Sequence, residues 1–155
     1  MGRDQAPQME LRCRLNSAML GMLRDFVSSV ARHLGFPEEQ VAQIEICVDE
    51  ACANAMEHAY AKSFEVEGHD RESHVLVVEL IFNGGDELTV RVTDHGCGTA
   101  PGIDAKMQSL EEYLDSARDR YRGLGFHLMR KFMDRVNVRS QPGRGTTVEM
   151  TKYRR

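Results

Sequence analysis

The chain has 155 residues, a length that suits one domain with a single hydrophobic core. Its 20 basic and 24 acidic residues give a net charge of −4, which disfavours non-specific binding to nucleic acid because proteins with that role usually have a basic surplus. No apolar stretch approaches the roughly 20 residues that cross a membrane, and the first residues lack the apolar segment of a signal peptide. We therefore expect a cytoplasmic protein that contacts neither nucleic acid nor membrane directly.

The first third of the chain predicts a strand followed by two helices. Apolar and charged residues alternate over residues 9–15, which is the period of a half-buried strand. Asn16 or Ser17 can cap a helix that ends at Gly35. A second helix opens with proline and two acidic residues, the favoured composition of a first turn, and runs to about Tyr60.

The rest of the chain predicts two β-hairpins with one helix between them. Alternating apolar residues indicate the strands, and glycine-containing turns join the strands of each hairpin. In chain order the elements are a strand over residues 75–82, a strand over 88–93, a helix over 123–134, a strand over 135–140 and a strand over 146–152. This mixture predicts an α+β fold, a two-layer sandwich with helices packed on one face of a mixed, largely antiparallel sheet. We expect residues 9–152 to form this domain and residues 1–8 to be a flexible N-terminus.

The second helix has a row of polar residues beside its buried stripe. Glu50, Asn54 and His58 recur every four residues, and at 100° per residue they lie at the edge of the apolar side. Glu45 and Asp49 lie mostly on the opposite side and are expected to face solvent. A carboxylate and an amide one turn apart can supply a general base and an oxygen ligand for a hard cation. The alternative is an amphipathic helix whose flank merely has three polar residues.

A glycine pair follows the strand that ends at Thr93, in the sequence Asp94-His95-Gly96-Cys97-Gly98. Glycine lets the backbone adopt positive φ and approach a ligand closely. An aspartate at a strand exit can accept a hydrogen bond from an exocyclic amine such as that of adenine. The alternative is a glycine-rich turn with a capping aspartate.

A second glycine pair, Gly123-Leu124-Gly125, stands at the start of the predicted third helix. Backbone N–H groups at a helix N-terminus bind phosphate well. Neither pair is a P-loop or a Rossmann fingerprint. The connection between them, residues 99–122, has a length typical of a lid or binding loop, and residues 109–117 can form a short helix within it.

The cysteines match neither a CxxC motif nor a zinc-binding pattern. A cytosolic chain keeps its cysteines reduced. We expect Cys13, Cys47 and Cys52 to be small buried hydrophobic residues.

The order of these motifs is distinctive. The chain has Glu50 and Asn54 on a helix, Asp94-x-Gly96-x-Gly98 after a strand, a long loop, Gly123-x-Gly125 before a helix, and Gly145-Thr146-Thr147-Val148 in a final strand. This order resembles the ATPase superfamily of gyrase B, Hsp90, histidine kinases and MutL. Within it, the stretches DEACANAMEHAY (residues 49–60) and GLGFHLM (residues 123–129) are similar to anti-sigma-factor serine kinases of bacteria. The resemblance covers residues 9–152.

The resemblance implies a role for each of these residues. Asn54 would bind a Mg²⁺ ion that bridges the phosphates of ATP, and Glu50 would be the base that accepts the proton of a protein serine or threonine hydroxyl. Asp94 would hold the adenine amino group, assisted by Thr146 or Thr147. Gly96 and Gly98 would shape the base pocket, and the phosphate subsite would comprise Gly123, Leu124 and Gly125. Catalysis would then consist mainly of positioning and of charge neutralisation by the metal.

The resemblance also implies a function and partners. The protein would be an ATP-dependent serine/threonine kinase that acts as an anti-sigma factor or partner-switching regulator and phosphorylates an anti-sigma-factor antagonist. A sigma factor and a second copy of the chain in a homodimer are the other implied partners. The alternative is a non-catalytic nucleotide-binding module that sequesters a sigma factor or regulator, although the presence of both Glu50 and Asn54 favours the enzyme. Two features depart from the family: Arg122 stands where these kinases often have glycine, and residues 99–122 match no lid of the family.

Overall fold

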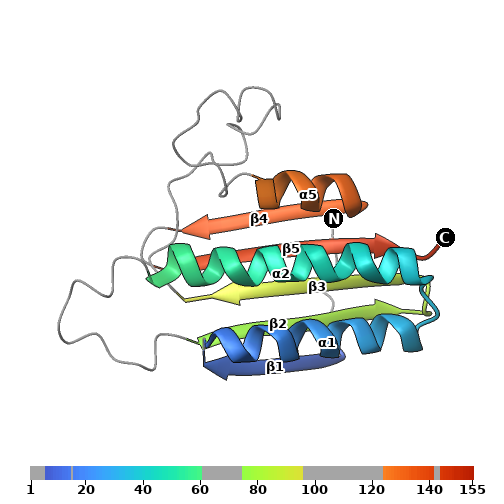
Figure 1. Cartoon of the computed structure of the whole chain (residues 1–155), viewed down its shortest axis with the longest axis horizontal. Coiled ribbons are helices and arrows are strands. Elements are labelled where there is room, and N and C mark those ends of the chain that lie inside the picture. Colours follow the sequence, from blue (N-terminus) through green and yellow to red (C-terminus); the bar gives the residue numbers. More distant parts are fainter. Residues whose placement is uncertain (1–5, 15, 61–74, 96–123, 142–143) are drawn as a thin grey trace.

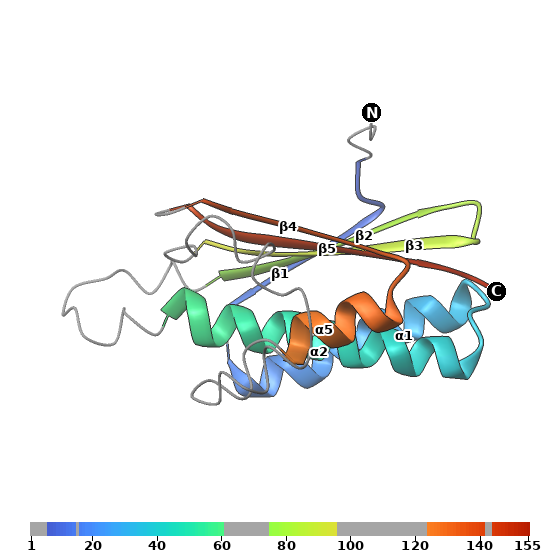
Figure 2. The ribbon, with the colours of Figure 1, turned by 90° about the horizontal axis from the view of Figure 1, so that it is seen from above.

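The protein forms two layers, with helices α1, α2 and α5 on one face of a five-stranded sheet (Figures 1 and 2). The computed structural model describes residues 6–14, 16–60, 75–95, 124–141 and 144–155. The predicted α+β two-layer sandwich is confirmed. None of the helices in these ranges is long and apolar enough to cross a membrane.

The sheet has the strand order β1-β2-β3-β5-β4, and every pairing among the described strands is antiparallel. The strands are β1 (Met9–Arg14), β2 (Val75–Asn83), β3 (Glu87–Asp94), β4 (Arg135–Gln141) and β5 (Gly145–Tyr153). The two predicted hairpins, β2–β3 and β4–β5, are joined at the centre by the pairing of β3 with β5. Because these two strands are antiparallel, the end of β3 lies beside the beginning of β5.

The three helices begin and end close to the predicted residues. They are α1 (Ser17–His33), α2 (Glu38–Tyr60) and α5 (Leu124–Phe132). Of the two predicted candidates for the cap of α1, Asn16 and Ser17, it is Asn16 whose side chain accepts a hydrogen bond from the backbone N–H of Ala18, at 2.9 Å. After α1, Gly35 adopts a φ of +82°, which favours glycine and ends the helix.

The core lies between the helices and the sheet. The alternate residues of β3 that face the helices are all fully or nearly fully buried. From α2, four residues of the predicted apolar stripe are buried in the same core: Ile44, Val48, Ala51 and Ala55. Cys47 and Cys52 are buried as predicted, and burial raises the pKa of each thiol to about 12 because the thiolate is poorly solvated there. Cys13, in the edge strand β1, is only half-buried.

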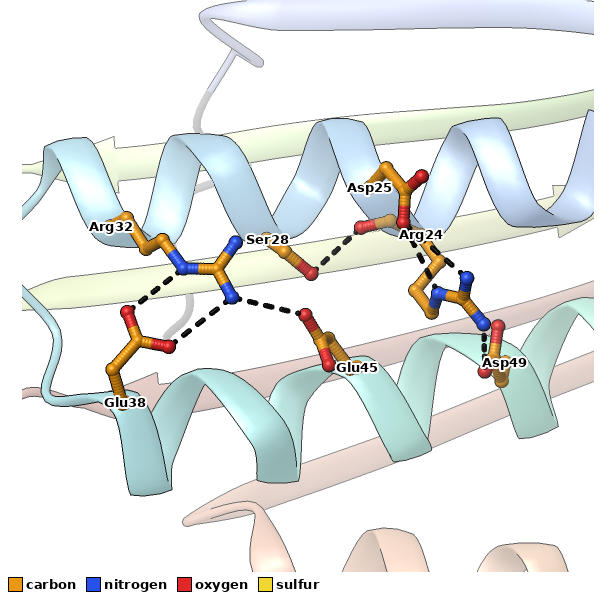
Figure 3. A network of polar contacts seen from close by, with 7 residues as sticks. All are labelled: Arg24, Asp25, Ser28, Arg32, Glu38, Glu45 and Asp49. Carbon is orange, nitrogen blue, oxygen red and sulfur yellow. Dashed lines mark hydrogen bonds and ion pairs between the residues drawn. The ribbon is translucent and has the colours of Figure 1, made fainter.

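Two arginines of α1 form ion pairs with carboxylates of α2 (Figure 3). Arg24 Nη1 lies 3.3 Å from Asp49 Oδ2, while Arg32 lies 2.9 Å from Glu38 Oε1 and 3.5 Å from Glu45 Oε1. The prediction that Glu45 and Asp49 simply face solvent was therefore incomplete, because both are only half exposed and both are paired with α1. These contacts link the two antiparallel helices along their outer side.

On the other face of the sheet, two threonine pairs join β3 to β5. The hydroxyls of Thr89 and Thr151 are 2.8 Å apart, and those of Thr93 and Thr147 are 3.1 Å apart. Thr89 and Thr151 are almost fully buried, although the described residues place no helix over this face. The pairs stabilise the central pairing that brings the end of β3 to the beginning of β5.

Candidate functional site

Several elements converge at one end of the molecule. There β3 and β4 end, β5 begins, α2 reaches its C-terminal half and α5 begins (Figure 1). Two buried polar residues belong to these segments: Asn54 is 9% exposed and Asp94 is 6% exposed. Buried polar groups are costly unless they are satisfied by a partner, so this end of the fold is the candidate site.

Asp94 is the last residue of β3 and lies on the side of the strand that faces the helices, in alternation with the buried Val92 and Val90. Its register partner on β5 is Thr146, whose backbone N–H donates to Asp94 Oδ1 at 3.3 Å. A carboxylate accepts up to about four hydrogen bonds, so Asp94 can hold this N–H and accept from a ligand amine at the same time. The geometry suits the predicted role as an acceptor for adenine.

Thr146 is held in place by a neighbour that sequence reasoning missed. The hydroxyls of Thr146 and Ser140 are 2.9 Å apart across the β4–β5 hairpin, and both residues are half-buried. Ser140 stands directly opposite Thr146 in the register. The alternation of β4 together with the five-residue turn would have indicated this partner.

Gly145 lets β5 begin in direct contact with Asp94. Its φ is +98°, and a Cβ atom built on it would lie 2.0 Å from the backbone oxygen of Asp94 and 2.9 Å from Cα of His95. Real Cβ atoms do not approach other atoms this closely, so only glycine fits. The sequence indicated a turn glycine here but gave no sign of its contact with the candidate adenine acceptor.

We expect Gly145→Ala to destabilise the protein by more than about 3 kcal/mol, because it combines a positive φ with a backbone clash. The control is Gly84→Ala: Gly84 has a φ of +66° with nothing within 4 Å of its built Cβ. That variant should lose only about 1 kcal/mol, the cost of the φ alone. Urea unfolding followed by circular dichroism measures both values. Equal losses in the two variants would contradict the close approach of β5 to Asp94.

Asn54 and Glu50 come from α2, one turn apart. Asn54 Nδ2 is buried and has no hydrogen-bond partner among the described residues. Leaving a buried donor without a partner costs about 1–3 kcal/mol, so the amide is suited to an acceptor that a ligand brings, such as a phosphate oxygen. Glu50 is half-buried at the edge of the core stripe, as the helical spacing predicted. Among the described residues, no three His, Cys, Asp or Glu side chains gather to hold a metal ion.

The predicted phosphate-binding turn is only partly described. α5 begins at Leu124 and continues through Gly125, so both residues stand in the first turn of a helix, as predicted. The other predicted features lie outside the described residues: Gly96, Gly98 and Gly123, together with Cys97, residues 99–122, the short helix over residues 109–117 and the side chain of His58.

Comparison with known proteins agrees with the observed fold and identifies the family of the chain. A profile of the histidine kinase-like ATPase domain matches residues 13–152. In the solved SiaB–SiaC complex from Pseudomonas aeruginosa, one chain superposes with a TM-score of 0.66 at 10% identity, over 94% of this chain and 89% of that one. The histidine kinase domain of the blue-light activated kinase from Erythrobacter litoralis EL346 superposes with a TM-score of 0.53 at 22% identity, over 86% of this chain and 60% of that one. The two structures agree in fold, and the profile match defines a histidine kinase-like ATPase domain.

Curated relatives narrow the class. The serine-protein kinase RsbW of Bacillus subtilis (strain 168) is 32% identical over 154 residues, which is 97% of this chain and 88% of that protein. The anti-sigma F factor of Thermoanaerobacter sp. (strain X514) is 32% identical over 145 residues, or 94% of this chain and 92% of that protein. The serine-protein kinase RsbW of Bacillus velezensis is 34% identical over 148 residues, or 94% and 84%. The chain therefore belongs to the anti-sigma-factor serine kinase family, as its motifs in α2 and α5 predicted.

Proposed function

We propose that this protein is an ATP-dependent serine/threonine kinase that phosphorylates an anti-sigma-factor antagonist. Relatives that match nearly the whole chain are named serine-protein kinase and anti-sigma F factor, which supports both parts of the proposal. The observation that carries it at the site is the buried Asn54 amide, whose nitrogen lacks a hydrogen-bond partner among the described residues, at the same end of the fold as the buried Asp94.

In this proposal the nucleotide lies across that end of the fold. Asp94 accepts a hydrogen bond from the adenine amino group, Thr146 assists, and Gly96 and Gly98 shape the base pocket. The phosphates extend toward the first turn of α5, where the N–H groups around Leu124 point at them and the helix dipole favours negative charge. Gly123 and Gly125 leave room for this approach.

Asn54 supplies the contact to the metal and the phosphates. Mg²⁺ usually takes one or two oxygen ligands from the protein and the others from phosphates and water, and an amide oxygen is a suitable ligand. When bound, the ion neutralises the charge that develops on the transferring phosphoryl group. The amide nitrogen of Asn54 remains able to donate to a phosphate oxygen.

Glu50 is the general base. Its carboxylate accepts the proton of a partner's serine or threonine hydroxyl while the hydroxyl oxygen forms a bond to the γ-phosphorus and the bond to the ADP oxygen breaks. Because α2 holds Glu50 and Asn54 one turn apart on a single rigid helix, the base and the phosphate contact keep a fixed separation. The same proposal places the protein in the cytoplasm as a homodimer. It also includes binding of a sigma factor, which the name of the relatives called anti-sigma F factor supports.

The metal role is tested by calorimetry with ATP in Mg²⁺ and in EDTA. Wild-type protein should bind ATP tightly only with Mg²⁺, and Asn54→Ala should lose most of this binding. The unfolding free energy of Asn54→Ala should change by less than about 1 kcal/mol, because relief of the unpartnered Nδ2 offsets the packing that is lost with the side chain. Asn137→Ala, at an exposed position of β4, is the matched control and should bind like wild type. If Asn54→Ala binds Mg-ATP like wild type, the assignment of Asn54 is wrong.

A further inference from the structure

Lys152 is a charged residue in an apolar setting that the proposed mechanism does not use. It lies near the end of β5 on the helix-facing side, in alternation with the fully buried Met150, and is 8% exposed. Its ammonium donates to Gln43 Oε1 on α2 at 2.7 Å and to the backbone oxygen of Phe132, the last residue of α5. One buried cation thus joins β5, α2 and α5.

The contact with Phe132 lies at the end of α5 where a cation is favoured. The last carbonyl groups of a helix have no partner within the helix and form the negative end of its dipole. A second contact nearby links the same two helices, since the thiol of Cys47 on α2 lies 3.9 Å from the backbone oxygen of Leu128. The positive charge of Lys152 also acts on this thiol: burial raises the pKa of Cys47, and Lys152 lowers it to a lesser degree.

Stability alone does not account for a lysine at this position. Burying an ammonium group is costly unless it is fully hydrogen-bonded, and replacing buried ionic groups by apolar ones of similar volume is often neutral or stabilising. A methionine would fill the space between α2, α5 and β5 without that cost. Unlike methionine, the lysine donates directional hydrogen bonds, and these fix where the end of α5 lies relative to α2.

We propose that Lys152 is a positioning residue that sets the placement of the phosphate-facing end of α5, an inference that rests on the proposed function. α5 has nine residues and is about 13 Å long, so a tilt of about 10° at its C-terminal end moves its first turn by about 2 Å. Gln43 belongs to the same helix as Glu50 and Asn54. Lys152 therefore fixes α5, which faces the phosphates, against α2, which holds the general base Glu50 and the metal contact Asn54. In this inference Lys152 itself touches neither the nucleotide nor the metal.

The test compares ATP with adenosine, which lacks the phosphates. In Lys152→Met, the dissociation constant for Mg-ATP should rise about tenfold or more, since displacement of binding groups by about 1 Å has effects of this order. The dissociation constant for adenosine should stay within about twofold of wild type, because the base subsite belongs to β3 and β5. Amide hydrogen exchange in α5 should become faster in the same variant, a readout that does not depend on nucleotide.

The matched control is Thr151→Val, the neighbouring residue on the opposite face of β5. It is 4% exposed and loses its hydrogen bond to Thr89, so it perturbs the same strand without touching α5. Its ratio of ATP to adenosine affinity should equal that of wild type. If Lys152→Met does not fold, Gln43→Met removes one of the two acceptors and should change the same ratio in the same direction.

The outcomes separate this inference from the proposed function. If wild-type protein binds no ATP, the proposed function is wrong. If wild type binds ATP and the lysine variant keeps the wild-type ratio, or weakens ATP and adenosine equally, Lys152 is only structural and the inference is overturned.

Discussion

Asp94→Asn should weaken ATP binding by at least about 10²-fold. The backbone N–H of Thr146 already occupies Asp94 Oδ1, so the amide oxygen of the variant would stay on that N–H. The NH₂ group would then face the adenine amino group, donor against donor. The loss of a charge-assisted hydrogen bond and the presence of a mismatched buried donor together exceed the roughly 3 kcal/mol that corresponds to this factor.

Calorimetry on wild type and Asp94→Asn tests this directly, with Asp25→Asn as the control. Asp25 is an exposed carboxylate on α1 that pairs with Arg24, so its variant should bind like wild type. ITP adds a second readout, because hypoxanthine has a carbonyl oxygen in place of the amino group. Asp94→Asn should prefer ITP to ATP relative to wild type. Equal ATP affinities of wild type and Asp94→Asn would mean that Asp94 does not contact adenine.

Glu50→Gln should reduce phosphoryl transfer by about 10²–10⁴-fold, the usual contribution of a general base. Glutamine keeps the size and hydrogen-bonding reach of glutamate but cannot accept a full proton. ATP affinity should change by less than about threefold, because the proposed site assigns nucleotide binding to Asp94 and Asn54 and not to Glu50. Single-turnover transfer to a cognate antagonist, measured with radiolabelled ATP, separates the two effects.

Two further α2 variants frame this result. Glu45→Gln removes a carboxylate that is paired with Arg32 on the outer side of the helix, and it should transfer at the wild-type rate. Asn54→Ala should lose both binding and transfer. If Glu50→Gln phosphorylates as fast as wild type, Glu50 is only a polar residue on the flank of a core helix.

Local patterns in the sequence were sufficient to predict the elements of this fold. The Asn16 cap, the stop at Gly35 and the antiparallel pairing within each of the two hairpins depend on neighbouring residues and their backbone preferences, and the structure agrees with each. The strand order β1-β2-β3-β5-β4 could not be predicted in this way, because the pairing of β3 with β5 joins residues that are 52 to 66 positions apart in the chain and depends on tertiary packing.

The candidate site shows the same division. The position of Glu50 and Asn54 at the edge of the core follows from helical spacing, although Asn54 is more deeply buried than an edge position suggests. The contacts of Gly145 with Asp94 and of Lys152 with Phe132 come from three-dimensional packing. From the sequence alone, these residues could be recognised only as a turn glycine and a lysine at the end of a strand. The expectation that Glu45 and Asp49 face solvent was incomplete because their partners belong to α1, and the position of α1 relative to α2 does not follow from local patterns.

The most direct test of the kinase function is a mass spectrum of a cognate anti-sigma-factor antagonist after incubation with the wild-type protein and Mg-ATP. We predict the addition of one phosphoryl group to a serine or threonine of the antagonist, with wild-type protein and not with Glu50→Gln over the same time. An antagonist that remains unmodified, while calorimetry shows that the wild-type protein binds Mg-ATP, would contradict the kinase function and leave a nucleotide-binding module that sequesters its partner.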